Sequence, residues 1–383
     1  MRVLILGGDG YLGWPTAMDM AAAGHEVLVA DNYLRRRIAE ATDSEPLLAT
    51  PSLSERARIF RAVSGHNISV RIVDLSDADA MFDLVRGFMP DSVIHYAEQP
   101  SAPYSMRGFN EARETFRNNL DVTFNCIWAV KEIVPECHIV KLGTMGEYGT
   151  PNIDIEEGWL EVEHKGRKDT FLYPRAAGSL YHTTKVLDTD LLWFYVRTYG
   201  LRVTDLMQGP VYGISTREAD LDPRLCPNFH YDDMFGTVIN RFLVQAVAGV
   251  PLTVYGKGGQ VRGYLNLRDT LQCVRLAAEN PAKPGELRIF NQLTEVFSVN
   301  EIADRVKAVG DRMDLDVKIE SIPNPRKEKE EHYYNPTHTG LTDLGLKPHL
   351  MTDDVLAVML ERIIENRYNI QTDRIMPRVR WNG

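Results

Sequence analysis

Short apolar runs alternate with longer amphipathic stretches through the first half of this 383-residue chain. The runs are apolar almost throughout, as is typical of strands in a parallel sheet that helices cover on both faces. We expect strands at residues 3–7, 26–31, 69–75, 92–97, 138–143 and 203–208, and helices at 11–23, 78–88, 115–133 and 176–199. This repeated strand–helix order predicts the α/β class with a doubly wound parallel sheet.

A glycine-rich stretch, GGDGYLG at residues 7–13, follows the first expected strand and opens the first helix. Gly7, Gly10 and Gly13 would allow a tight turn, a close approach of the backbone to a pyrophosphate, and packing of the helix on the strand. The free N–H groups and the dipole of the helix N-terminus favour such an anion. Asp31 ends the second strand. The context therefore predicts a dinucleotide site of the Rossmann type rather than a turn without a ligand.

Asp31 favours NAD over NADP, because its carboxylate can accept hydrogen bonds from a ribose 2′-hydroxyl and would repel a 2′-phosphate. Arg35 and Arg36 complicate this, since an arginine can bind a 2′-phosphate, contact the pyrophosphate or adenine, or lie in solvent. Asp74 and Leu75 end the third strand, where they either touch the adenine or cap the strand. The expected cofactor-binding residues are Gly7, Gly10, Tyr11, Leu12, Gly13, Asp31, Asn32, Arg35, Arg36, Asp74, Leu75, Tyr96, Asn118, Tyr181 and Lys185.

Tyr181 and Lys185 are four residues apart, which places them on one face of the expected helix at 176–199. A lysine ammonium, with the positive nicotinamide nearby, would lower the pKa of Tyr181, so that its phenolate could take a proton from a sugar hydroxyl. Thr144, at the end of the fifth strand, would hydrogen-bond the same oxygen, or simply cap a turn. His182 and Glu147 are further acid–base candidates, although such residues are also commonly packed or solvated.

After about residue 206, proline and glycine become more frequent and the expected strands become shorter. We expect residues 1–205 to form the NAD-binding domain, and residues 206–383 to form a smaller α/β domain over the carboxyl edge of the sheet. Some segments of the second half are expected to return to the large domain.

The composition is that of an ordinary soluble protein, with 44% hydrophobic and 25% charged residues. A net charge of −10 argues against a nucleic-acid surface. The four cysteines form no CxxC pair, so we expect neither a metal site nor a disulfide framework. The chain has no apolar run long enough to span a membrane and begins directly on a strand, which predicts a cytoplasmic enzyme.

Taken together, the glycine motif, the acid ending the second strand, Thr144 and the YxxxK pair resemble the extended short-chain dehydrogenase/reductase family. Long runs carry a closer likeness to those members that join sulfite to UDP-glucose. They include "DSVIHYAEQPSAPYSM", "HIVKLGTMGEYGTPNIDIEEG", "LTVYGKGGQVRGYLNLRDT" and "PNPRKEKEEHYYN".

This resemblance implies a reaction on UDP-glucose. The sugar would be oxidised at C4 with NAD⁺, lose water across C5–C6, add sulfite at C6 and be reduced again at C4. Sugar dehydratases of the family carry an acid pair after the threonine, and this chain has Met145 and Gly146 there. Met145 would leave an uncharged space that a sulfite dianion tolerates, and Glu147 or His182 would supply acid–base help.

The resemblance also implies the contacts to the sugar nucleotide. Plant-type members carry an arginine where this chain has Pro100, and Arg107 or His182 could substitute for it. The expected substrate-binding residues are Thr144, Gln208, Val254, Tyr255, Arg262 and Arg326. Backbone groups of Val254 and Tyr255 would contact the uracil, Arg262 and Arg326 would bind the diphosphate, and Asn118 or Asn119 would contact the sugar or position the tyrosine.

Three alternatives stay open. A UDP-sugar 4-epimerase and a 4,6-dehydratase share the cofactor and the tyrosine. A nucleotide-sensing protein on an inactive scaffold is disfavoured, because Thr144, Tyr181 and Lys185 are all present. Family members are usually dimers through two paired helices, here expected at 115–133 and 176–199, although apolar faces there would fit a buried core equally well.

Overall fold

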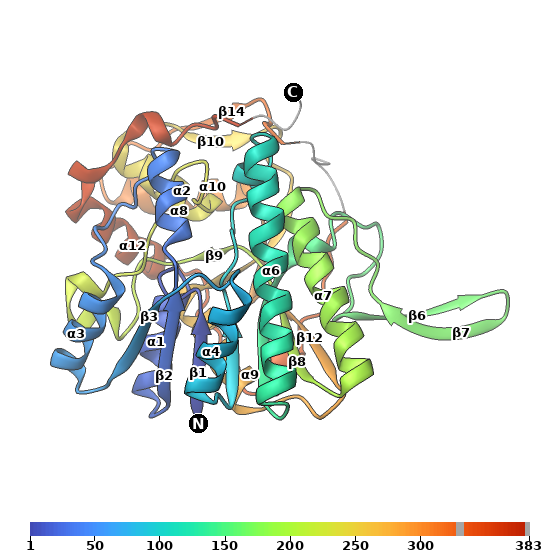
Figure 1. Ribbon diagram of the computed structural model, residues 1–383. Coiled ribbons are helices and arrows are strands. Elements are labelled where there is room, and N and C mark those ends of the chain that lie inside the picture. The colour runs from blue at the N-terminus through green and yellow to red at the C-terminus, as the bar shows by residue number, and fades with distance from the viewer. Residues whose placement is uncertain (327–332, 380–383) are drawn as a thin grey trace.

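The computed structural model describes residues 1–326 and 333–379. Its centre is a seven-stranded, wholly parallel sheet in the order β12-β8-β5-β4-β1-β2-β3 (Figure 1). The strand order reverses between β1 and β4, the place where doubly wound sheets bind ligands. The predicted fold class is thus confirmed. The strands are β1 (Arg2–Leu6), β2 (Glu26–Asp31), β3 (Ile68–Ile72), β4 (Ser92–His95), β5 (His138–Thr144), β8 (Arg202–Gln208) and β12 (Leu287–Gln292).

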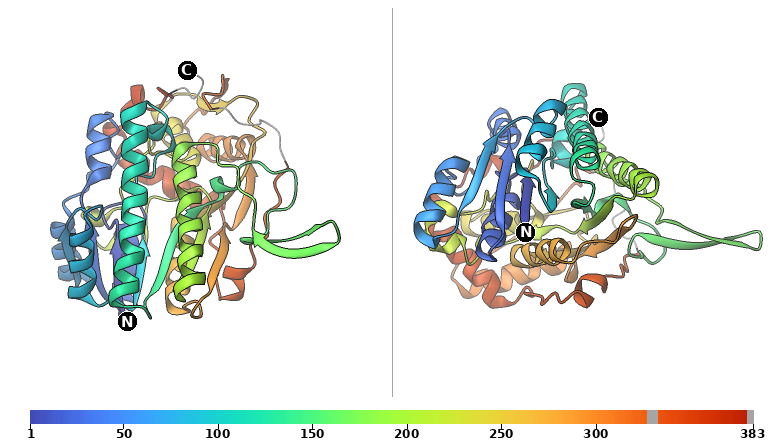
Figure 2. Two further views of the ribbon diagram at one scale, coloured as in Figure 1. Left: turned by 45° about the vertical axis from the view of Figure 1, so that its right-hand side comes forward. Right: turned by 60° about the horizontal axis from the view of Figure 1, so that its bottom comes forward.

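Helices cover both faces of this sheet, as the continuous apolar strands require (Figure 2). Along β1, Leu4 and Leu6 face one core while Val3 and Ile5 face the other, so both sets of alternate side chains are buried. The first core is closed by α4 (Ala78–Phe88), α6 (Phe109–Ile133) and α7 (Leu180–Tyr199), and the second by α1 (Gly13–Ala22), α3 (Leu53–Ser64) and α9 (Leu267–Glu279).

Two helix starts differ from the expected ones, and both have a local cause. Helix α6 begins at Phe109, earlier than expected, because its first turns are exposed and charged and carry no apolar periodicity. Helix α7 begins at Leu180 rather than residue 176, because the Ser179 hydroxyl accepts the backbone N–H of His182 and caps the helix there.

The second half of the chain contributes to two places. Strand β12 pairs with β8 at the edge of the large sheet, and α9 lies against that sheet. The other segments lie around a separate core. These segments are β9 (Val211–Tyr212), α8 (Val238–Ala248), β10 (Leu252–Tyr255), β11 (Val261–Asn266), β13 (Glu295–Ser298), α10 (Val299–Arg312), β14 (Ile319–Ile322) and α12 (Asp353–Glu365). The expected domain boundary near residue 205 stays a prediction.

A two-stranded arm, formed by β6 (Trp159–His164) and β7 (Arg167–Leu172), projects from the body (Figure 1). Short helices α2 (Leu34–Ala41), α5 (Ala102–Ser105) and α11 (Gly340–Asp343) complete the elements that the site uses or that adjoin it. In the described part of the chain, no helix combines the length and the apolar character needed to cross a membrane.

Candidate active site

One cavity of about 890 Å³ lies over the carboxyl ends of the large sheet. Both halves of the chain line it, so the glycine-rich loop, the Tyr181 helix and the later arginines meet at one space. Most of the predicted site residues are brought together here. They are Gly7, Gly10, Tyr11, Leu12, Gly13, Asp31, Asn32, Arg35, Leu75, Tyr96, Asn118, Thr144, Met145, Tyr181, His182, Gln208, Tyr255, Arg262 and Arg326.

The glycine-rich loop is shaped for a ligand that its backbone approaches closely. A Cβ at Gly13 would lie 2.1 Å from the Gly7 carbonyl oxygen, so helix α1 packs on the turn only with glycine there. A Cβ at Gly10 would meet nothing nearer than 3.5 Å within the protein, yet Gly10 lines the cavity. Packing within the protein therefore does not require a glycine at residue 10. A ligand that approaches the backbone closely would require one. The loop thus fits the pyrophosphate of a dinucleotide.

Asp31 lies at the end of β2 with both carboxylate oxygens oriented by the backbone. Oδ1 accepts the N–H of Tyr33 at 2.6 Å and Oδ2 accepts the N–H of Asp9 at 2.9 Å. Burial, and then the neighbouring Asp9 carboxylate, raise the pKa of Asp31 to about 6. At neutral pH the side chain is ionised and can still accept hydrogen bonds from a ribose through its remaining lone pairs.

The two arginines after Asp31 have different surroundings. Arg35 lines the cavity, with its guanidinium carbon 4.8 Å from the centre of the Phe235 ring. Arg36 lies outside the cavity lining and donates to the carboxylate of Asp9 at 2.7 and 2.8 Å. Asp74 also lies outside the lining, where it accepts hydrogen bonds from Asn32 and Ser76. Of the two readings of Asp74, the structure favours the strand-end cap.

Thr144 and Tyr181 both face the cavity, from the end of β5 and the first turn of α7. The backbone N–H of Tyr181 donates to Ser105 Oγ at 3.1 Å, which ties the start of α7 to α5. Burial, and then the Glu98 carboxylate, raise the pKa of the Tyr181 phenol above its ordinary value. The tyrosine is therefore a neutral phenol in this state, and it needs nearby positive charge to act as a base.

Lys185 supplies a positive charge from the next turn of α7. Its Nζ lies 2.5 Å from the carbonyl oxygen of Leu142, 2.6 Å from Glu98 Oε1 and 5.9 Å from the centre of the Tyr181 ring. Asn119 of α6 braces the same helix, because its amide donates to Thr184 Oγ1 at 3.0 Å. Asn118, its neighbour, lines the cavity. The tyrosine–lysine pair is thus held by contacts from four neighbouring segments: α5, β5, the loop after β4, and α6.

Glu147 lies behind the site and not in it. Its side chain is 0% exposed, and its Oε1 accepts the backbone N–H of Thr144 at 3.2 Å. The Nζ of Lys141 lies 3.4 Å from that oxygen and 3.2 Å from Asp205 Oδ2. Glu147, Lys141 and Asp205 thus form a buried ion cluster beneath the end of β5. The expectation that Glu147 exchanges protons with the sugar therefore has no geometric support. Its place in the structure is to hold the loop that presents Thr144.

His182 faces the cavity close to the residues that replace the acid pair. A Cβ at Gly146 would lie 2.5 Å from both Cδ2 and Nε2 of His182, so the ring occupies the space that a side chain there would need. Ser179 Oγ accepts the N–H of His182 and lies 2.9 Å from its Nδ1. If the serine hydroxyl donates to Nδ1, the ring carries its hydrogen on Nε2.

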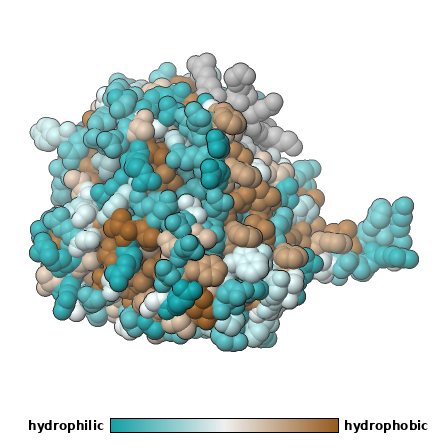
Figure 3. All heavy atoms as spheres, in the orientation of Figure 1, coloured by the Kyte–Doolittle hydropathy of each residue, from teal (hydrophilic) through white to brown (hydrophobic). Residues whose placement is uncertain are grey.

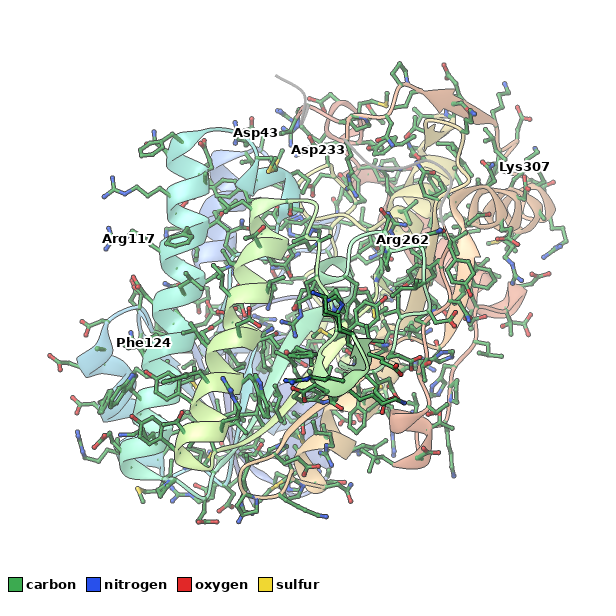
Figure 4. The ribbon with its side chains drawn as sticks, turned by 90° about the vertical axis from the view of Figure 1, so that its right-hand side faces the viewer. Asp43, Arg117, Phe124, Asp233, Arg262 and Lys307 are labelled. Atoms are coloured by element: carbon green, nitrogen blue, oxygen red, sulfur yellow. The ribbon has the colours of Figure 1, made fainter. Side chains whose placement is uncertain are left out.

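Charge around this histidine favours anions. Burial, followed by the positive charges of Arg326 and Arg262, lowers the pKa of His182 to about 3. The ring is therefore neutral at physiological pH. Arg262, labelled in Figure 4, comes from β11. It lines the same cavity as Arg326. A neutral N–H donor beside two guanidinium groups is a combination suited to phosphate or sulfite oxygens.

Two neighbouring residues of β10 that were predicted to contact the sugar nucleotide have different surroundings. Tyr255 lines the cavity and its ring lies against Arg241, whereas Val254 is 0% exposed and belongs to the core behind β10. Alternation along the strand explains the difference, because neighbouring side chains face opposite sides. Val254 can therefore offer a ligand no side-chain contact, and a contact through its backbone stays a prediction. Arg107 is exposed and lies outside the lining, so of the two substitutes for the missing arginine only His182 is in place.

Sequence reasoning missed Glu98 and the buried ion cluster under β5. Lys141 interrupts an apolar strand, and Glu98 follows the carboxyl end of β4, so both had a signal in the sequence. Other lining residues belong to no motif that marks them in the sequence: Phe235, Gln260 and Tyr334 come from loops, Arg241 comes from α8 and Tyr264 from β11. Among residues 1–326 and 333–379, no group of three or more His, Cys, Asp or Glu side chains is arranged to hold a metal ion.

Comparison with known proteins agrees with this geometry. The model of the NAD dependent epimerase/dehydratase family matches residues 3–291. A UDP-sulfoquinovose synthase of Spinacia oleracea chloroplasts is 48% identical over 380 residues, covering 99% of this chain and 79% of the relative. A UDP-sulfoquinovose synthase of Sulfolobus acidocaldarius is 44% identical, covering 100% of this chain and 98% of the relative.

Solved structures share the fold at lower identity. A UDP-glucose 4-epimerase of Bifidobacterium longum, in complex with NAD⁺ and UDP, superposes with a TM-score of 0.72 at 19% identity, covering 97% of this chain and 100% of that one. The UDP-glucose 4-epimerase of Thermotoga maritima, with UDP-glucose, gives 0.70 at 20% identity, covering 95% and 99%. The chain belongs to the NAD dependent epimerase/dehydratase family, and within it to the UDP-sulfoquinovose synthases.

Proposed function

We propose that this protein makes UDP-sulfoquinovose from UDP-glucose and sulfite, with NAD as its cofactor. The overall change replaces the 6-hydroxyl of the glucose by a sulfonate: hydrogen sulfite adds and one water leaves. One observation carries the proposal. A single cavity joins the glycine-rich loop to Thr144 and Tyr181, and places Met145 and Gly146 beside them instead of an acid pair.

The residues of the first half would hold NAD. Gly7, Gly10 and Gly13 would leave room for the pyrophosphate, Asp31 would accept hydrogen bonds from the adenosine ribose, and Lys185 would contact the cofactor from the α7 side. Bound NAD⁺ supplies the hydride acceptor at C4 and, once reduced, the hydride donor. Because the hydride returns, no net oxidant is consumed.

Tyr181 is the base for the 4-hydroxyl of the glucose. Burial keeps its phenol protonated in the structure, so the positive charges of Lys185 and the nicotinamide must lower its pKa for catalysis. Thr144, held by Glu147 through its backbone N–H, would hydrogen-bond the same oxygen. A ketone at C4 then acidifies the hydrogen at C5, so the 6-hydroxyl can leave as water.

Addition of sulfite at C6 needs a space free of carboxylates. Two carboxylates a few ångströms away would oppose a sulfite dianion, and Met145 and Gly146 bring none. His182 can donate from Nε2 to the leaving hydroxyl or to the incoming anion, and Arg262 and Arg326 add positive potential. Glu147 is buried away from this space, which leaves His182, as a neutral hydrogen-bond donor, to assist at C6.

We also propose that the protein is a homodimer through α6 and α7. Apolar residues gather over these two helices on the face seen in Figure 3. Phe124 lies on the outer side of α6 (Figure 4) and is 44% exposed, while its ring packs near Trp128 and Tyr195. The exposed members of this face are Phe109, Phe116, Phe124, Leu187, Phe194 and Tyr199. A second copy would bury them.

Mass spectrometry on the purified protein incubated with UDP-glucose, NAD⁺ and sulfite tests the function. The expected product is a UDP-sugar heavier by one hydrogen sulfite less one water, formed only when sulfite is present. A product of unchanged mass with galacto configuration would replace the proposal by an epimerase. Simple loss of water would replace it by a dehydratase. A reaction without sulfur incorporation but with NADH formed would mean that free sulfite is not the donor.

A further inference from the structure

Asp9 stands inside the glycine-rich loop but does not line the cavity. Its side chain is 2% exposed, and its carboxylate is shared by two arginines. Arg36 of α2 donates from Nε at 2.7 Å and from Nη2 at 2.8 Å, and Arg56 of α3 donates from Nη2. One buried carboxylate therefore orients two guanidinium groups next to the loop that would bind the dinucleotide.

Arg36 has almost no hydrogen-bonding capacity left. Besides its two bonds to Asp9, it donates from Nη1 to the Thr50 carbonyl at 3.0 Å and from Nη2 to the Pro51 carbonyl at 2.8 Å. Four of its five N–H groups are thus taken by this chain's own oxygens. Yet Arg36 follows β2 by only a few residues, the region where an arginine recognises the 2′-phosphate of NADP. Arg36 thus lies in this region, but its N–H groups are already bonded to oxygens of the protein.

The same loop residue also orients the acid that meets the ribose. The backbone N–H of Asp9 donates to Asp31 Oδ2 at 2.9 Å, so Asp9 contacts Asp31 through its main chain and Arg36 through its side chain. A ribose 2′-phosphate would face the Asp31 carboxylate, and Arg36, which could offset this repulsion, is bound to Asp9. Of the two other arginines of α2, Arg35 is stacked on Phe235 and Arg37 donates to the carbonyl oxygen of Asn32.

We propose that Asp9 is a specificity determinant for NAD over NADP, because it holds Arg36 away from the adenosine ribose. This rests on NAD being the cofactor, as proposed above. Asp31 alone repels a 2′-phosphate, but an arginine released beside it would supply charge-assisted hydrogen bonds to that phosphate. The choice of cofactor therefore depends on two carboxylates, of which only Asp31 would touch the nucleotide.

Calorimetric titration of the purified protein with NAD⁺ and with NADP⁺ tests this without any turnover. In Asp9→Ser we expect the ratio of the NADP⁺ to the NAD⁺ dissociation constant to fall at least about tenfold. The Asp9→Ser/Arg36→Gln double variant should keep the wild-type ratio, and so should Arg36→Gln alone. An unchanged ratio in Asp9→Ser, or a gain that persists without Arg36, would overturn the proposal.

Folding of the variants needs its own control, because Arg56 is 0% exposed and would lose its partner in Asp9→Ser. The same comparison is therefore made in an Arg56→Met background, which removes the unpaired charge. The tenfold fall must appear there too. If the wild-type protein binds no NAD⁺ at all, the cofactor assignment fails. If it binds NADP⁺ as tightly as NAD⁺, only the role of Asp9 fails.

Discussion

Gly146 and His182 share one space beside Thr144: a Cβ on Gly146 would lie 2.5 Å from Cδ2 and Nε2 of the histidine. Real Cβ atoms essentially never approach so closely, so a side chain at residue 146 and the present position of the ring exclude each other. Where dehydratases of the family carry an acid pair, this chain has Met145 and Gly146, and the His182 imidazole fills the space beside Gly146. Burial and nearby arginines keep that imidazole neutral.

Replacing Gly146 by alanine should displace the His182 ring and lower turnover about tenfold or more, because small displacements of a catalytic group cost this much. The NAD⁺ dissociation constant should stay unchanged. Adding His182→Ala removes the collision, so the double variant should be no slower than His182→Ala alone. Strictly additive losses in this cycle, measured as kcat for sulfonation, would mean that the two residues act independently.

Tyr181→Phe should lower turnover by about 10²- to 10⁴-fold, the range typical of losing a general base. NAD⁺ binding, measured by titration, should be retained because the ring stays in place. Tyr368→Phe is the matched control, since Tyr368 is 87% exposed and is not among the residues that line the cavity. Equal rates for Tyr181→Phe and wild type would remove the tyrosine from the proposed mechanism.

Met145→Asp should impair sulfonation more than oxidation at C4. A carboxylate added beside C6 opposes an incoming sulfite dianion, whereas hydride transfer from C4 adds no negative charge at that place. Single-turnover NADH formation and sulfonated product are measured on the same sample, with Met145→Leu as the uncharged control. Sulfonation that survives unchanged in Met145→Asp would refute the argument from charge.

His138 should make the protein less stable in acid. Burial, and then Arg288 and Arg202, lower its pKa from the ordinary 6.5 to about 3. Between these values the unfolded chain binds a proton that the folded one does not. The contribution of His138 is therefore fully present above pH 6.5 and is lost as the pH falls toward 3, by up to about 1.4 kcal/mol per pH unit.

Urea unfolding at several pH values between 7 and 4 checks this. His138→Gln, which keeps a hydrogen-bonding group for Thr204, should lose less stability over that window than the wild type. His164 is exposed at the tip of the arm, so His164→Gln should follow the wild-type profile. Parallel profiles for His138→Gln and wild type would contradict the assignment.

Phe124→Glu should weaken the proposed dimer by at least about tenfold, because it places a charge in the centre of the apolar face on α6 and α7. Val358→Glu on α12 changes a somewhat more exposed apolar residue elsewhere and should leave the dimer intact. Sedimentation equilibrium of the two variants and the wild type measures the difference. A wild-type protein that sediments as a monomer would end the dimer proposal.

Much of the fold could be predicted because its signals are local. The apolar strands, the glycine loop and the tyrosine–lysine spacing each depend on residues close in sequence, and the structure has them at the predicted places. The β6–β7 arm was not predicted, since five of its twelve strand residues are charged and only the end nearest the body packs on the core. The start of α6 was missed for the same reason.

The sequence by itself determined which elements form and where a dinucleotide and a base would lie, because backbone geometry and side-chain periodicity act over a few residues. Only the tertiary structure decided which distant groups meet. It set Glu147 against the backbone of Thr144 and Lys141, gave Arg36 to Asp9, and put His182 in the space left by Gly146. Such contacts follow from the spatial order of the strands in the sheet and from the need of each buried charge for a partner. The spacing of residues along the chain reveals neither of these.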